Sequence, residues 1–168
     1  MVTSMSNVNE IFSEKYDLSQ FENFVEVVNT SDDFLETALL KKYSDLNGFI
    51  IASKNNIEII KDKLNPNTKI LDAENSIPTG YKLFITKHIT DVVDVDHFEL
   101  FLSNLHKAMD EYSRVILLEK NIEMKEIEDQ MNIKNMNDID YVFSESGFMV
   151  TNVIKIDDKE YIIEALRR

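Results

Sequence analysis

His88 is the histidine whose position along the chain best suits it to chemistry. It follows Leu83–Thr86, an apolar run that predicts a buried strand, so it would lie just beyond the carboxyl end of that strand. Open α/β sheets bind ligands at this edge, and an imidazole there could act as a general base. A single histidine in a loop is more often structural or simply exposed, and the sequence leaves both interpretations open.

Two carboxylates also lie on or near predicted strands. Glu26 belongs to the apolar run Phe24–Val28, and Asp72 comes near the end of Lys69–Ala73. Glu26 could contact a ligand, or backbone amides could satisfy it at the strand end. Asp72 could bind a ligand or stabilise a turn, which is a common use of aspartate.

The sequence lacks the other familiar catalytic and metal-binding patterns. It has no cysteine, which excludes disulfides, thiolate zinc sites and thiol nucleophiles. It contains no G-x-S-x-G, G-x-x-x-x-G-K or H-E-x-x-H motif, and its three glycines argue against a phosphate-cradling loop. His97 and His106 are nine residues apart, so on one helix they would point to opposite sides. We therefore predict no catalytic side chain and no metal site.

Charge and hydropathy limit the partners of the chain. Its 31 acidic and 18 basic residues give a formal charge of −13, which opposes binding to a nucleic acid backbone. No apolar run is long enough to span a membrane, and the start lacks the basic and apolar regions of a secretory signal. We therefore expect a cytoplasmic protein that binds neither nucleic acid nor membranes.

Strand-like and helix-like segments alternate, which predicts one α/β domain with a mostly parallel sheet covered on both faces. We expect an N-terminal segment over 1–20 and a single domain over 21–168. The predicted strands are Phe24–Val28, Gly48–Ala52, Lys69–Ala73, Leu83–Thr86, Arg114–Leu118, Met149–Ile156 and Tyr161–Leu166. The predicted helices are Asp33–Tyr43, Asn55–Leu64 and Asp96–Met109, and Met124, Met131 and Met136 mark a further amphipathic stripe. That stripe either packs on the domain or forms a deformable contact surface for a partner.

Several short segments carry a family resemblance: SEKYD at 13–17, FVEV at 24–27, ILDAENSIP at 70–78, RVILLE at 114–119 and SESGF at 144–148. In these segments and in element order, the chain resembles the class I S-adenosylmethionine-dependent methyltransferases that act on small molecules. The resemblance implies a doubly wound, seven-stranded, mostly parallel sheet ending in an antiparallel hairpin. It places Glu26, Asp72 and Ala73 on the cofactor side and His88 on the acceptor side. A flavodoxin-like fold is the alternative, against which the final strand-turn-strand argues.

The chain departs from the family pattern at the cofactor loop. Val28, Thr30 and Asp32 occupy the three glycine positions of the family's E/D-x-G-x-G-x-G motif. β-Branched residues resist positive φ, so the loop is expected to follow another path or to block close approach of the cofactor. Asp32 and Asp33 are expected at the start of the next helix, where they favour the helix dipole but oppose an incoming carboxylate. Thr30 and Asp33 also resemble a capping box.

Two more departures concern the ribose and the lid. Ile51 stands where the family carries an acidic residue for the ribose hydroxyls, with Ser53 nearby, and isoleucine cannot accept their hydrogen bonds. Only about six residues separate Asp17 from the first strand, where the family usually has a helix that covers the cofactor.

These departures together favour a methyltransferase-like protein that has lost normal S-adenosylmethionine binding and needs no cofactor. It would serve as a binding or regulatory module that pairs with a partner protein or with itself. The alternative is an active S-adenosylmethionine-dependent methyltransferase that acts on a small molecule through a rearranged loop, using Glu26, Asp72 and His88. Such an enzyme mainly positions its acceptor, so the absence of a catalytic motif does not exclude it.

Overall fold

Seven strands form a single mixed sheet in the order β3-β2-β1-β4-β5-β7-β6. The computed structural model describes residues 4–72, 76–120 and 136–168. The strands are β1 Asn23–Val27, β2 Asn47–Ile51, β3 Lys69–Ile70, β4 Leu83–Lys87, β5 Arg114–Lys120, β6 Phe148–Lys155 and β7 Glu160–Arg167. The first five run parallel, and β7 lies antiparallel between β5 and β6. This confirms the predicted doubly wound α/β fold with a C-terminal antiparallel hairpin.

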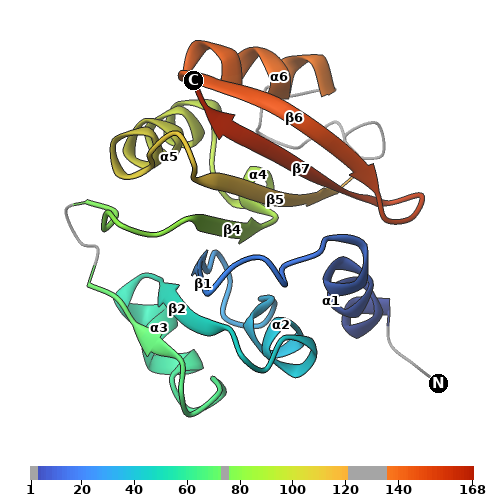
Figure 1. Cartoon of the computed structure of the whole chain (residues 1–168), viewed down its shortest axis with the longest axis vertical. Coiled ribbons are helices and arrows are strands. Elements are labelled where there is room, and N and C mark those ends of the chain that lie inside the picture. Colours follow the sequence, from blue (N-terminus) through green and yellow to red (C-terminus); the bar gives the residue numbers. More distant parts are fainter. Residues whose placement is uncertain (1–3, 73–75, 121–135) are drawn as a thin grey trace.

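Helices cover both faces of the sheet (Figure 1). They are α1 Ser4–Lys15, α2 Glu36–Lys42, α3 Lys54–Ile60, α4 Ile89–Val92, α5 Val95–Ala108 and α6 Met136–Glu145. One face packs against residues of α4, α5 and α6, with Phe98, Leu102 and Phe143 fully buried. The opposite face packs against α1, α2 and α3. Within the described residues, no helix is long and apolar enough to cross a membrane.

The helix α5 shows how local sequence sets an element. The Asp94 side chain accepts the backbone N–H of His97 at 2.9 Å and so caps the helix. Phe98, Leu102 and Leu105 recur at helical spacing and are all fully buried. The sequence-based boundaries of this helix were right to within one residue.

The start of α2 differs from the prediction. A capping box of Thr30 and Asp33 was expected, but the helix begins at Glu36, and the Thr30 hydroxyl instead lies 3.4 Å from the carbonyl of Asp33. The N-cap residue Leu35 has no capping side chain of its own, and its N–H donates to the carboxylate of Glu26. The cap therefore comes from a neighbouring strand, where the local sequence pattern could not reveal it.

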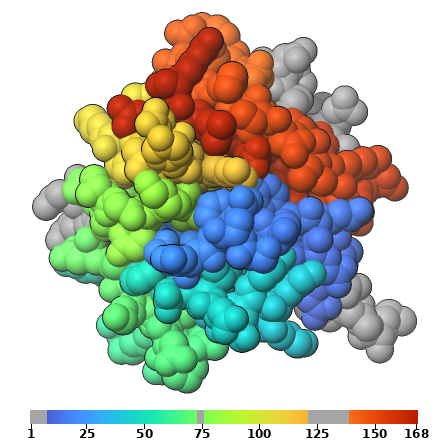
Figure 2. All heavy atoms as spheres, in the orientation of Figure 1, coloured from blue at the N-terminus to red at the C-terminus, as the bar shows by residue number. Residues whose placement is uncertain are grey.

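The N-terminal segment packs on the sheet. Phe12 and Leu18 are fully buried in the same cluster as residues of β1, β4 and β5. In Figure 2 the blue atoms of this segment lie against the orange and red atoms of the C-terminal hairpin. The Tyr16 hydroxyl donates to the carboxylate of Glu164 on β7, and Arg114 donates to the same hydroxyl at 3.3 Å. No helix lies between Asp17 and β1, as predicted, and α1 precedes that stretch.

Candidate functional site

A cavity of about 510 Å³ opens at the carboxyl ends of β4 and β5, beside the turn that begins β7. Its wall combines two apolar side chains of α1 with charged groups of both signs. The lining residues are Val8, Ile11, Asp33, Lys87, His88, Lys120, Asp157, Asp158, Lys159 and Glu160. This is the edge of an open α/β sheet at which ligands usually bind.

His88 adopts a left-handed backbone conformation at this edge, with φ 57° and ψ 35°. A non-glycine residue seldom holds such angles unless its surroundings fix them. Its N–H donates to the carbonyl of Leu118 at 2.8 Å, and the next two N–H groups, of Ile89 and Thr90, donate to the buried carboxylate of Glu119. These bonds fix the turn from β4 into α4.

The imidazole of His88 lies between two carboxylates from distant parts of the chain. Nε2 is 2.8 Å and 2.9 Å from the two carboxylate oxygens of Glu160, at the start of β7. Nδ1 is 3.8 Å from Oδ2 of Asp33, in the segment before α2. The side chain of His88 is only 15% exposed. Its contacts join the end of β4 to the segment before α2 and to the start of β7, which meet at the cavity.

Lys87 adds a buried cation to this cluster. Its Nζ lies 2.5 Å from Oδ1 of Asp33 and 2.6 Å from Oδ1 of Asn9 on α1. The lysine side chain is 3% exposed and that of Asp33 is 17% exposed, so the pair is largely shielded from water. Asn9 also donates to the carbonyl of Phe34 at 3.2 Å, which holds α1 over the end of β1.

The segment between β1 and α2 is closed by its own side chains. Val28 is 4% exposed and packs with Ile50 and Ile60. The Asn29 amide donates to the Thr86 hydroxyl at 2.7 Å and to the carbonyl of Lys87 at 2.8 Å, which ties the segment to β4. Among the described residues, positive φ occurs only at His88, Gly80 and Gly147, so this segment uses no left-handed conformation.

Glu26 lies beneath that segment rather than in the cavity wall. It is fully buried, and one carboxylate oxygen accepts the N–H of Leu35 at 2.7 Å. The other oxygen, Oε1, has no hydrogen-bond partner among the described residues. Burial raises the pKa of Glu26 to about 8, assisted by the charge of Glu36 and opposed by nearby backbone N–H groups and by Lys87. The carboxyl group therefore keeps its proton at neutral pH.

Asp72 borders a second cavity, of about 780 Å³, at the carboxyl ends of β2 and β3. This cavity has mostly apolar walls, formed by Ile51, Ala52, Ser53, Lys54, Ile57, Ile70, Leu71 and Asp72. The Ser53 hydroxyl accepts the N–H of Asn56 and so caps α3. Ala73, the other predicted cofactor contact, lies outside the described residues, as do Met124 and Met131 of the methionine stripe.

The residues predicted from sequence thus occupy three separate places. Glu26 lies inside the β1–α2 junction, Asp72 borders the larger cavity, and His88 borders the smaller one. Sequence reasoning missed Lys87, Glu160 and the Asp33 contacts, because the cluster depends on how the hairpin registers against β5. In that register the backbone of Lys120 on β5 lies opposite Glu160 on β7. Within the described ranges, no group of three or more potential ligand side chains could hold a metal ion.

Comparison with solved structures places the fold. The chain superposes on the mitomycin 7-O-methyltransferase MmcR with a TM-score of 0.83 at 18% identity, over 96% of this chain and 53% of that one. It superposes on the O-methyltransferase NcsB1 of neocarzinostatin biosynthesis, in complex with S-adenosylmethionine and 2-hydroxy-5-methyl naphthoic acid, with a TM-score of 0.80 at 15% identity, over 94% and 52% of the two chains. For PigF with S-adenosylhomocysteine the values are 0.79 and 17%, over 93% and 53%.

These likenesses show the class I methyltransferase fold and confirm the resemblance seen in the sequence. This chain spans about half the length of the solved structures that it matches. No protein-family model and no curated protein matches the sequence.

Proposed function

We propose that this chain is a methyltransferase-fold binding module that does not hold S-adenosylmethionine in the manner of that fold's enzymes. The observation that carries the proposal is the closed segment between β1 and α2. The side chain of Val28 is buried in the core, and the side chain of Asn29 donates hydrogen bonds to residues at the end of β4. In a glycine-rich loop the backbone can approach a cofactor closely, because glycine has no side chain. Here the side chains of Val28 and Asn29 occupy the space over the strand ends.

Electrostatics support the same conclusion. S-adenosylmethionine carries a sulfonium and an ammonium group, both positive, together with a carboxylate. The buried ammonium group of Lys87 is already paired with the carboxylate of Asp33, so it is not available to bind the carboxylate of the cofactor. The residues present therefore do not fit the cofactor at this end of the sheet.

The module would bind through what remains open at the edge. The cavity beside His88 offers apolar side chains of α1 next to the charged side chains of Lys87 and Glu160. A small ligand in that cavity, or a partner protein that covers it, would contact three segments at once. Such a contact suits a regulatory role, because binding there would fix the relative positions of α1 and the hairpin.

A second candidate is an active methyltransferase that acts on a small molecule. The two cavities at the carboxyl ends of the strands favour it, because one could take the nucleoside part of a cofactor and the other an acceptor near His88. The solved structures of NcsB1 and PigF contain S-adenosylmethionine or S-adenosylhomocysteine. That function requires the cofactor to enter by a path that avoids Val28 and Asn29.

Calorimetric titration with S-adenosylmethionine and S-adenosylhomocysteine separates the two candidates, with thermal shift as a second readout. The binding module predicts no binding at millimolar ligand, whereas micromolar binding would overturn it and support the enzyme.

A loop variant tests the cause of the lost affinity. Thr30→Gly with Asp32→Gly, alone and then with Val28→Gly, should create measurable affinity if the side chains of this segment are what exclude the cofactor. The first pair is a necessary step, because Val28 is buried and its removal also weakens the core. Equal binding by the wild type and the triple variant would contradict the role given to these side chains.

A further inference from the structure

Among the described strands, β6 pairs with β7 on one side and with no strand on the other. Of the two outer strands, β3 has two residues and β6 has eight. A two-residue edge offers little to another strand, whereas an eight-residue edge presents a row of backbone donors and acceptors. Figure 1 shows β6 outside β7, at the border of the sheet.

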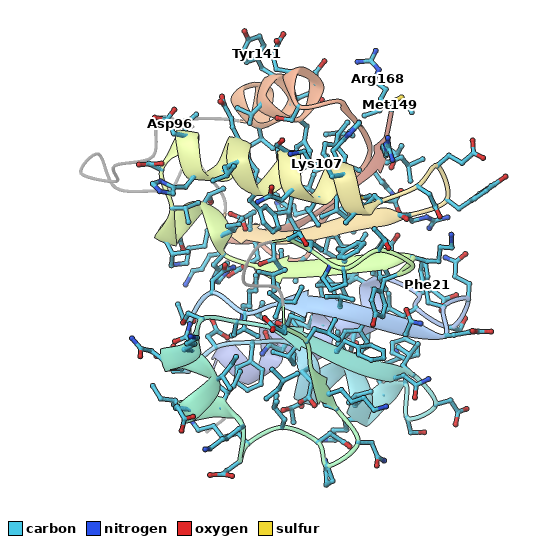
Figure 3. The ribbon with its side chains drawn as sticks, turned by 90° about the vertical axis from the view of Figure 1, so that its left-hand side faces the viewer. Phe21, Asp96, Lys107, Tyr141, Met149 and Arg168 are labelled. Atoms are coloured by element: carbon cyan, nitrogen blue, oxygen red, sulfur yellow. The ribbon has the colours of Figure 1, made fainter. Side chains whose placement is uncertain are left out.

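The side chains of β6 differ from the rest of the surface. The chain carries a net charge of −13, yet Phe148–Lys155 contains no acidic residue and only one charge, at Lys155. Met149 is 50% exposed and Val153 is 44% exposed, one on each face of the strand. Figure 3 shows Met149 at the periphery of the molecule, at the same end as Arg168. An apolar, nearly uncharged edge on an acidic protein is a candidate contact surface.

We infer that β6 pairs with β6 of a second copy of this chain, in antiparallel orientation, to form a symmetric dimer. The strand is complementary to itself about its centre, at Thr151 and Asn152. A two-fold axis there pairs apolar with apolar and polar with polar side chains: Met149 with Ile154, Val150 with Val153, and Thr151 with Asn152. The inference does not depend on the proposed function.

Charge selects this orientation. A parallel pairing in register would place Lys155 of one copy against Lys155 of the other, and like charges directly opposite are destabilising. In the antiparallel register Lys155 faces Phe148 of the second copy, so the two lysines lie at opposite ends of the interface. Because β6 contains no acidic side chain, pairing along it brings no carboxylates of the two strands together.

A β-bulge sets which side chains of β6 share a face. The register of β6 with β7 shifts between Val150 and Asn152, so Thr151 has no counterpart on β7. Beyond the bulge the alternation of side chains is shifted by one residue, so Met149 and Ile154 lie on one face of the strand, and Val150 and Val153 lie on the other. The side chains that the two-fold axis brings together therefore lie on the same face of the joined sheet, as antiparallel pairing requires.

Sedimentation velocity over a range of protein concentrations tests the inference. We expect a monomer–dimer equilibrium that shifts toward dimer as salt is raised, because salt screens the repulsion between two acidic chains. Met149→Lys and Val153→Lys should each raise the dimer dissociation constant about tenfold or more, because each places a cation opposite an apolar side chain. Both positions are exposed, so the variants should unfold at the midpoint of the wild type when both are compared at a concentration at which the wild type is monomeric.

Leu100→Lys on α5 is the matched control, because Leu100 is a 57% exposed apolar residue away from the edge strand, and it should leave the dimer unchanged. The chain has no native cysteine, so Thr151→Cys should be cross-linked between copies by a short bismaleimide, and Tyr112→Cys should not. A monomer at every concentration, a species larger than the dimer, or a dimer that Val153→Lys leaves intact would overturn the inference.

Discussion

The N–H of Leu35 donates to the buried carboxyl group of Glu26 at 2.7 Å, so the first turn of α2 is capped by a residue of β1. Glu26 is fully buried, and its second oxygen has no partner among the described residues. Capping by an ionised carboxylate would be favourable at a helix start, but burial raises the pKa to about 8. The cap therefore works in its protonated form at neutral pH.

This arrangement predicts that the free energy of unfolding falls as pH rises. The folded pKa, about 8, lies above the ordinary value of 4.5, so between these pH values the unfolded chain loses the proton that the folded chain keeps. The contribution is fully present below pH 4.5 and is lost as the pH approaches 8, at up to about 1.4 kcal/mol per pH unit. Glu36 and Lys87 are the charged groups that act on Glu26.

Glu26→Gln checks this pH dependence, because the amide stays neutral throughout. Urea unfolding from pH 5 to 8 should show a flatter dependence in the variant than in the wild type, with the largest gain at the alkaline end. Glu99→Gln, an exposed change on α5, should follow the wild type. Parallel wild-type and Glu26→Gln curves would mean that Glu26 is ionised in the folded protein.

The ion pair between Lys87 and Asp33 should matter more for stability than a surface pair. Lys87→Met leaves Asp33 in a shielded position without its cation, which should lower the free energy of unfolding by about 3 kcal/mol. Lys87→Met combined with Asp33→Asn should recover part of that loss, because no unpaired charge remains. Chemical unfolding measures both values.

Lys82→Met is the control for this pair. Lys82 forms an ion pair with Asp110, but their side chains are 48% and 50% exposed, so its loss should have a far smaller effect. Equal losses from Lys82→Met and Lys87→Met would indicate that water reaches the Lys87 pair.

His88 should show both backbone strain and coupling to Glu160. Its φ of 57° suits glycine, so His88→Gly should be more stable than His88→Ala by about 1 kcal/mol, although both lose the same imidazole.

A double-mutant cycle of His88→Ala and Glu160→Ala should give a coupling energy of about 1–3 kcal/mol, since the two groups lie 2.8 Å apart. Additive losses would show that the two side chains are independent.

The fold could be predicted because its signals are local. Val115–Leu118 is an apolar run within the predicted strand Arg114–Leu118, and these four residues are buried in β5, between β4 and β7. The cluster around His88 could not be predicted in the same way, because its contacts join residues far apart in the chain. Asn9 is 78 residues from Lys87, and Glu160 is 72 residues from His88. Such contacts depend on strand register and on the docking of α1, neither of which leaves a periodic signal in the sequence.

The docking of the N-terminal segment should depend on the hydroxyl of Tyr16. That hydroxyl donates to Glu164 on β7, and Tyr16→Phe should lower the free energy of unfolding by about 1–2 kcal/mol and speed proteolysis within α1. Tyr112→Phe, at a 71% exposed position, should change neither property.

Burial, together with Glu164, raises the pKa of Tyr16 from 10.0 to about 12. The contribution of this hydroxyl to the free energy of unfolding is therefore fully present below pH 10 and is lost as the pH rises to about 12. Ultraviolet titration of the phenols should therefore show one tyrosine that ionises last and that is missing from Tyr16→Phe, whereas an unchanged titration would place the Tyr16 hydroxyl in water.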